Sequence, residues 1–347
     1  MKKFFIALAV LVVSGAAFAQ SSVTLYGLAD INFGSHKSAA TGLRQTRIES
    51  SGIYESRFGF KGSEDLGGGL KANFLLEQGF QLDSGAASAG QAFSRQSYVG
   101  LSGGFGEIKV GKMWTAYDDI SGATQAALNS VLSPFQGVWL SSSYKDNPNN
   151  SIYYASPLMG GVSGAVSYSL GENKNTPVAG VAAGSVASVH VKYTGGPLYA
   201  GAAYQTEKAT GAVPATKFTR LNASYDWGVA KLLLGYGRVA FDGKTTNDWQ
   251  VGADVPVARA WLVSGGVARS TGGVIGFTSD ASYIGKRTDV TAAGQADVVR
   301  TGYSLAASYD LSKRTKLYGG YHATTTKVAG ATDAKGSLLA VGMLHLF

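Results

Sequence analysis

The stretch SRFGFKGSEDLGGGLKANFLLEQGF, residues 56–80, alternates apolar and charged side chains on both sides of a glycine-rich turn. Phe58 and Phe60 share one parity before the turn, and Arg57 and Lys61 share the other. After the turn, the polar set is Lys71, Asn73 and Glu77, and the apolar set is Ala72, Phe74 and Leu76. Successive side chains of a β-strand point to opposite faces. The stretch therefore predicts a hairpin with one apolar face, toward lipid or a neighbouring subunit, and one charged face, toward water.

The same alternation recurs along the chain. It is found in VTLYGLADINF (23–33), SVHVKY (188–193), DWQVGADV (248–255) and TGYSLAASY (301–309). Runs of roughly nine to ten alternating residues have the length of a tilted transmembrane β-strand.

Short and long connections alternate between these runs. Short turns begin at Ser63, Ser102, Ser156, Thr194, Asp226, Pro256 and Asp310. Longer polar segments cover 34–53, 81–92, 113–150, 171–187, 206–216, 240–247, 270–299 and 323–336. A secreted β-sandwich is the alternative, but its architecture does not require this alternation of connections. The pattern predicts an all-β fold, an antiparallel transmembrane barrel of about sixteen strands with short periplasmic turns and long extracellular loops.

The chain begins MKKFFIALAVLVVSGAAFAQ, which has the charged start, short apolar run and Ala-x-Ala site of a secretory signal. We expect residues 1–19 to be removed and residues 20–347 to form a single barrel. The terminal Phe347 is typical of strands recognised by outer-membrane insertion machinery, so we expect the protein in the cell outer membrane. The net charge of +8 is scattered and includes two signal lysines, so we expect no nucleic-acid partner.

Enzymatic signatures are missing from the sequence. The four histidines, His36, His190, His322 and His345, show no metal-binding spacing, and no nucleophile elbow or phosphate loop is present. We therefore expect neither an enzyme nor a bound cofactor or metal.

The candidate functional residues are charges with lumen-facing parity. A charged side chain on the lipid face near the midplane would cost about 2 to 4 kcal/mol, so Arg57, Lys61, Arg95 and Lys109 are expected to line the pore. Arg57 lies on the second predicted strand and Arg95 on the fourth, at equivalent points, so the two side chains should lie near each other on one wall. Lys71 and Glu77 are equally well explained as ordinary solvated lumen residues.

Segment 113–150 is long and rich in apolar residues. They are Leu128, Val131, Leu132, Phe135, Val138, Trp139 and Leu140. Folding this segment back into the barrel would bury them and narrow the channel. Asp118 and Asp119 would then face the arginines across a constriction and set a transverse field. The alternative for both is a role in solubility or capping at the start of the loop.

With these residues in view, the chain resembles the general porins of β-proteobacteria, such as those of Neisseria, Bordetella, Burkholderia and Comamonas. The resemblance rests on SVTLYGLAD (22–30), the stretch from Ser56 onward, FSRQSYVGLSGGFGEIKVGK (93–112), NNSIYYASP (149–157) and the terminal phenylalanine strand. It implies sixteen strands, a homotrimer formed through the early strands, a third loop inside the pore and an arginine cluster that includes Arg57 and Arg95.

Two departures from this family pattern concern the pore. Relatives often carry a third wall arginine before the tyrosine segment, where Lys145 is the nearest cation here. SPFQGVW (133–139) replaces the P-E-F-G-G tip of some third loops.

The predicted function is a passive, water-filled channel for small hydrophilic solutes and for inorganic or organic anions, in contact with outer-membrane lipid. The basic wall predicts a preference for anions. Two alternatives stay open: a substrate-specific channel, and a surface adhesin or receptor that uses segment 270–299 and transports incidentally.

Overall fold

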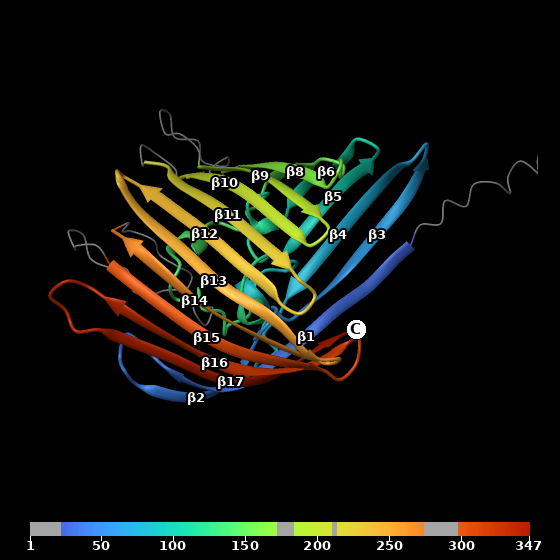
Figure 1. Cartoon of the computed structure of the whole chain (residues 1–347). Coiled ribbons are helices and arrows are strands. Elements are labelled where there is room, and N and C mark those ends of the chain that lie inside the picture. Colours follow the sequence, from blue (N-terminus) through green and yellow to red (C-terminus); the bar gives the residue numbers. More distant parts are fainter. Residues whose placement is uncertain (1–21, 172–183, 210–213, 274–297) are drawn as a thin grey trace, which may run out of the picture.

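The computed structural model describes residues 22–171, 184–209, 214–273 and 298–347, and it contains one closed antiparallel sheet (Figure 1). The strands are β1 (Ser22–Lys37), β2 (Arg44–Ser50), β3 (Arg57–Gly67), β4 (Leu70–Gly79), β5 (Gln96–Gly103), β6 (Gly106–Lys112), β7 (Ser151–Ala155), β8 (Val162–Leu170), β9 (Ser185–Gly195), β10 (Leu198–Lys208), β11 (Thr216–Asp226), β12 (Lys231–Phe241), β13 (Lys244–Ala258), β14 (Trp261–Gly272), β15 (Val298–Asp310), β16 (Thr315–Lys327) and β17 (Ala334–Leu346). Four short 3-10 turns accompany them: η1 (Ser88–Gly90), η2 (Asp118–Ile120), η3 (Ala127–Asn129) and η4 (Leu140–Ser142). No helix among the described residues is long and apolar enough to cross a bilayer.

Strand β1 closes the barrel by pairing on both of its edges. One edge pairs with β17, and the other pairs first with β3 through Ser22–Leu28 and then with β2 through Ile31–Lys37. Because β2 and β3 lie one after the other along β1, they form a single strand that is interrupted at residues 51–56. The seventeen strand segments therefore make sixteen strands around the barrel, which confirms the predicted fold.

The two faces of the sheet differ as the alternation predicts. Phe58 and Phe60 are exposed on the outer surface, where the lipid would lie, while Arg57 and Glu77 contact each other inside. Inward positions elsewhere carry buried polar groups such as Asp30. A polar interior and an apolar exterior are the inverse of a soluble sheet and suit a water-filled barrel in lipid.

The seven predicted short turns all join neighbouring strands, but three of the expected long connections are wrong. For segment 323–336, β16 continues to Lys327 and β17 begins at Ala334, so the connection covers only residues 328–333. For segment 34–53, β1 continues to Lys37 and β2 resumes at Arg44, so the connection covers only residues 38–43. For segment 240–247, a two-residue turn at Asp242 and Gly243 joins β12 to β13, with φ angles of 47° and 73°. Asp-Gly is a strong signal for this tight hairpin. Polar composition suggested loops in these places because most residues at these strand ends are polar.

Some expectations fall on residues outside the described part of the chain. The signal segment 1–19, most of the expected loops 171–187 and 270–299, and the middle of 206–216 lie there.

Candidate functional site

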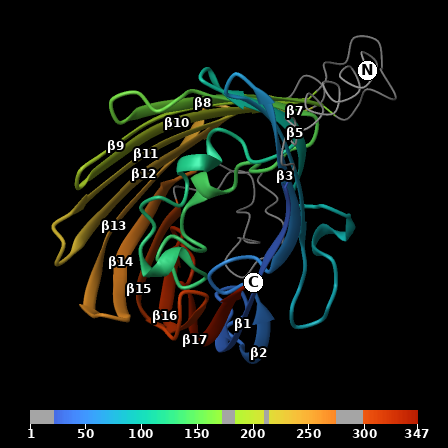
Figure 2. The same ribbon diagram turned by 90° about the vertical axis from the view of Figure 1, so that its right-hand side faces the viewer.

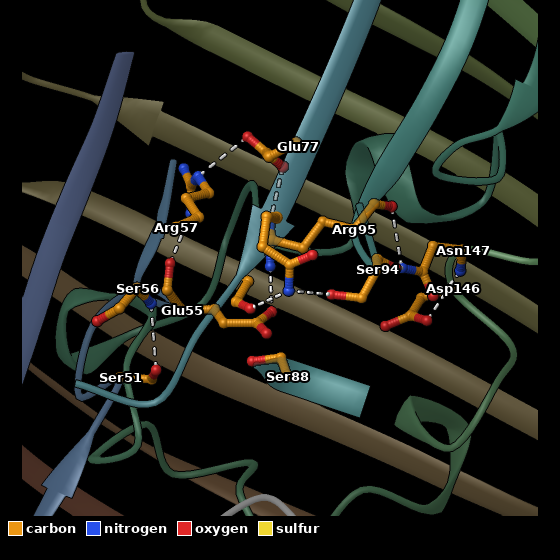
Figure 3. A network of polar contacts seen from close by, with 12 residues as sticks. Ser51, Glu55, Ser56, Arg57, Glu77, Ser88, Ser94, Arg95, Asp146 and Asn147 are labelled. Atoms are coloured by element: carbon orange, nitrogen blue, oxygen red, sulfur yellow. Dashed lines mark hydrogen bonds and ion pairs between the residues drawn. The ribbon is translucent and has the colours of Figure 1, made fainter. Parts of the chain in front are cut away.

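The side chains of Arg57 and Arg95 meet on one carboxylate, that of Glu77 (Figure 3). Arg57 begins β3, Glu77 lies near the end of β4, and Arg95 directly precedes β5, so neighbouring strands bring the three together. The Nε–H group of Arg95 donates to Oε1 of Glu77 at 2.8 Å, and Nε of Arg57 lies 3.3 Å from Oε2. Tyr26 also donates its hydroxyl to Oε2 at 2.8 Å. Two like charges can lie close together here because a shared anion holds them.

A second carboxylate, that of Glu55, completes the cluster. It forms an ion pair with Nη1 of Arg95, and its backbone carbonyl accepts a hydrogen bond of 3.1 Å from Arg57. The side chains of the two arginines are 23% and 12% exposed, whereas that of Glu77 is 6% exposed. The carboxylate of Glu77 therefore lies behind the two guanidinium groups, which are its more accessible partners.

The interruption between β2 and β3 places Glu55 and Arg57 in the lumen. Ser51 has a φ of 73°, which turns the chain out of the strand. The buried carboxylate of Asp30 then accepts backbone N–H groups of Ile53 at 2.7 Å and Tyr54 at 2.8 Å. Buried carboxylates are stabilised by such hydrogen bonds. Asp30 thus fixes the interruption that sets the position of Glu55.

Residues 113–150, which we call the third loop, lie inside the ring of strands in Figure 2. Their apolar side chains pack against the inner wall, with Leu132 and Val138 fully buried and Trp139 nearly so. Strand glycines make room for them: a Cβ atom at Gly302 would lie 2.1 Å from the carbonyl oxygen of Pro134. These contacts explain the apolar composition of the loop.

Hydrogen bonds from several strands hold the third loop against this wall. Asp248 on β13 accepts the backbone N–H of Ser141 at 2.7 Å, and Ser264 on β14 accepts that of Ala127 at 2.7 Å. At the loop tip, the backbone N–H of Val131 donates to the carbonyl of Gly52 at 2.8 Å. The loop therefore also contacts the interruption that carries Glu55.

Asp118 and Asp119 do not face the arginines, which corrects the expected transverse field. Asp118 accepts hydrogen bonds from the hydroxyl groups of Tyr144 and Ser121 within the third loop. Burial, with a contribution from the neighbouring Asp146, raises the pKa of its carboxyl to about 7. Both side chains lie where the third loop meets β9 and β10, because η2 packs against these strands.

Asp119 has partners on the wall at β7 and β9. It accepts the hydroxyl of Tyr153 at 2.6 Å, and Nδ1 of His190 lies 3.4 Å from the same oxygen. Burial raises the pKa of this carboxyl as well. The sequence located both aspartates correctly at the start of the third loop but could not show which wall the loop follows.

The three predicted lysines occupy different parts of the lumen. Lys61 is exposed, with its Nζ 5.1 Å from the centre of the Tyr26 ring. Lys109 lies 3.3 Å from Glu107 and 4.2 Å from the centre of the Tyr153 ring. Lys145 is exposed near Glu207, which accepts its backbone N–H group at 2.6 Å. None of the three joins the arginine cluster.

A cavity of about 550 Å³ lies between the third loop and Arg95. Its lining includes Glu55, Arg95, Trp139, Tyr144, Asp146 and Arg220. Acidic and basic side chains therefore border the same cavity.

Arg220 on β11 is the functional candidate that the sequence reasoning missed. Its guanidinium carbon lies 5.4 Å from the ring centres of Tyr117 and Trp139 and 5.7 Å from that of Tyr144. Its Nη1 donates to the carbonyl of Ser121 at 2.9 Å. Three rings around one cation form a strong attachment for the third loop. The inward parity of Arg220 was the available signal in the sequence, but its aromatic partners lie 76 to 103 residues earlier in the chain and could not be predicted from local pattern.

Comparison with known proteins settles the family. A family model described as Gram-negative porin matches residues 6–329. The chain is a Gram-negative porin. This porin is 37% identical to outer membrane porin protein 32 of Delftia acidovorans, over 92% of this chain and 88% of that protein. It is 30% identical to an outer membrane porin of Bordetella pertussis over the full length of both.

A solved structure, described as an anion-selective porin from Comamonas acidovorans, has the same fold. It matches with a TM-score of 0.76 and 27% identity, covering 94% of this chain and all of that one. The porin described here accordingly forms a water-filled channel in the outer membrane through which small hydrophilic solutes pass. Among its described residues, no group of three or more histidine, aspartate or glutamate side chains is arranged to hold a metal ion.

Proposed function

We propose that this porin is a passive channel with a modest preference for anions, narrowed by its third loop. The observation that carries the proposal is the arrangement of Arg57 and Arg95 around Glu77. The side chain of Glu77 (6% exposed) is less exposed than those of Arg57 (23%) and Arg95 (12%). Arg57 is also more exposed than Glu55 (15%), so Arg57 is the most accessible charge of the cluster. The sign of the charge nearest the permeating ion decides selectivity.

The other charged side chains in the pore indicate that the preference for anions is modest. Lys61 is exposed in the lumen, and no carboxylate of the described chain lies within 4 Å of its Nζ. Lys109 is partly balanced by Glu107, and Glu55 and Asp146 line the cavity beside Arg95. The anion selectivity named for the Comamonas porin points in the same direction.

We also propose a homotrimer that associates through the early strands. The outer surface of β1 and β3 to β6 carries an apolar groove of about 580 Å³ lined by side chains such as Phe74, Val99 and Ile108. Val99 is 65% exposed in the single chain, which is a high value for an apolar side chain. A second copy would cover this surface. We propose no catalytic role for the protein.

The selectivity proposal is tested by removing both arginines. In planar bilayers under a tenfold KCl gradient, the double variant Arg57→Ser with Arg95→Ser should shift the zero-current potential toward the cation-selective sign, because Glu55 and Glu77 lose their partners. The matched control, Lys208→Ser with Lys217→Ser, removes two exposed cations at the ends of β10 and β11 and should leave the potential unchanged. An unchanged potential in the arginine variant would refute the proposal.

A further inference from the structure

A second apolar groove, of about 780 Å³, lies on the outer surface where the barrel closes. Its floor lies at Ala307 on β15 and Gly319 on β16, which are paired neighbours with little or no side chain. Larger side chains border it, namely Phe33, Ile48, Trp261, Tyr309, Leu317 and Met343. The groove opens toward the hydrocarbon of the membrane, so its natural occupant is an apolar chain.

The periplasmic end of this groove carries an aromatic pair. The rings of Trp261 and Tyr309 lie 4.9 Å apart at their centres, at the first residue of β14 and near the last residue of β15. Tryptophan and tyrosine at strand ends mark the level of the lipid head groups. A lipid whose acyl chain lay in the groove would therefore have its head group next to the short turns.

Those turns are basic. Arg259 in the β13–β14 turn and Lys313 and Arg314 in the β15–β16 turn are all exposed. The two turns are adjacent, because the backbone N–H of Asp310 donates to the carbonyl of Ala260 at 2.9 Å. Asp310 itself is paired with Lys316 at 2.6 Å. In the described part of the chain, no carboxylate lies within 4 Å of the three turn cations.

The groove on the early strands has the opposite charge at its border. Glu64, near the end of β3, lines it. An anionic head group would be repelled there. The basic border therefore distinguishes the groove at the closure from the surface proposed for association.

We propose that the groove at the barrel closure binds an anionic phospholipid of the periplasmic leaflet. One acyl chain lies over Ala307 and Gly319, the aromatic pair borders the glycerol region, and Arg259, Lys313 and Arg314 contact the phosphate. Arginine suits phosphate because its guanidinium donates two parallel hydrogen bonds.

The test uses Trp261 as the reporter. The porin is reconstituted in phosphatidylcholine vesicles that contain either brominated phosphatidylglycerol or brominated phosphatidylcholine at equal fractions, since bromine quenches tryptophan fluorescence on contact. Subtracting the signal of the Trp261→Phe variant isolates this residue. We expect phosphatidylglycerol to associate about fivefold more strongly than phosphatidylcholine, given the attraction of a few cations for an anionic head group.

Three variants decide between the outcomes. The triple variant Arg259→Gln, Lys313→Gln and Arg314→Gln should lose the preference for phosphatidylglycerol. The matched control is the triple variant Lys208→Gln, Lys217→Gln and Lys244→Gln, which removes the same charge at the opposite rim and should keep the preference. Ala307→Leu should weaken quenching by both lipids by filling the groove. Equal quenching by the two lipids in the unmodified porin overturns the proposal. Failure of either lipid to quench Trp261 also overturns it and indicates a groove covered by protein.

Discussion

The Nε–H group of Arg95 donates a hydrogen bond of 2.8 Å to the carboxylate of Glu77, an acid on the neighbouring strand of the same wall. Arg57 approaches the other oxygen of that carboxylate, so one anion compensates part of the charge of two cations. The arginine wall is therefore a mixed cluster, and its effect on ions depends on Glu77 as much as on the arginines.

The first prediction concerns Glu77. Glu77→Gln keeps a similar shape and an acceptor for Arg95 while removing one negative charge. A unit charge about 7 Å from a permeating ion in water changes its energy by roughly 0.6 kcal/mol. Removing the charge favours anions and disfavours cations by this same amount, so we expect the ratio of anion to cation permeability to rise about sevenfold, measured from zero-current potentials. Glu64→Gln, at an exposed position near the end of β3, is the control, and an equal rise in that variant would argue against a local effect.

Arg220 is predicted to hold the third loop in place. Arg220→Ala removes a hydrogen bond and contacts with three aromatic rings, which together should lower the free energy of local loop opening by about 2 kcal/mol. Open forms would become roughly thirtyfold more populated. Single-channel recordings should then show more current noise. Lys217→Ala, on the outward face of the same strand, should record like the unmodified porin.

Asp30 and Tyr318 are predicted to stabilise the interruption between β2 and β3. The hydroxyl of Tyr318 donates to Asp30 at 2.6 Å. Asp30→Ala leaves the N–H groups of Ile53 and Tyr54 unpaired, at about 1 to 3 kcal/mol each, whereas Tyr318→Phe removes one hydrogen bond. Urea unfolding followed by tryptophan fluorescence should show the larger loss for Asp30→Ala. Tyr321→Phe on the outward face provides the comparison, and the reverse order of the two losses would contradict this role for Asp30.

Asp118 gives the porin a predicted pH dependence. Burial raises the pKa of this carboxyl from its ordinary value near 3.8 to about 7, so the folded state binds the proton more firmly than the unfolded state. Stability should therefore fall as pH rises from about 4 to about 7 and level off above that. Asp118→Asn should reduce this fall, as measured by thermal unfolding across the pH range. Asp65→Asn, at an exposed position near the end of β3, should retain it. A fall of equal size in Asp118→Asn would rule out this carboxyl as its cause.

The fold was predictable because its signals are local. The alternation around Phe58 and Phe60 and the glycine-rich turns depend on neighbouring residues, so sequence alone indicates strands, faces and the number of crossings. The Asp242-Gly243 hairpin was also readable, but the polar composition around it suggested a loop.

The site was only partly predictable, because its contacts are long-range. Parity placed Arg57 and Arg95 on one wall, yet the role of Glu55 depends on the chain turning at Ser51. The partners of Asp118 depend on the path of the third loop, which is determined by small residues on distant strands such as Gly302. Local periodicity carries no information about either.

The most direct measurement of the central claim is the zero-current potential of the unmodified porin in a planar bilayer under a tenfold KCl gradient at neutral pH. Because Arg57 and Arg95 are more exposed to the lumen than Glu77, we predict a potential of the sign that an anion-selective membrane gives, smaller than the ideal value. A potential of the cation-selective sign would contradict the account.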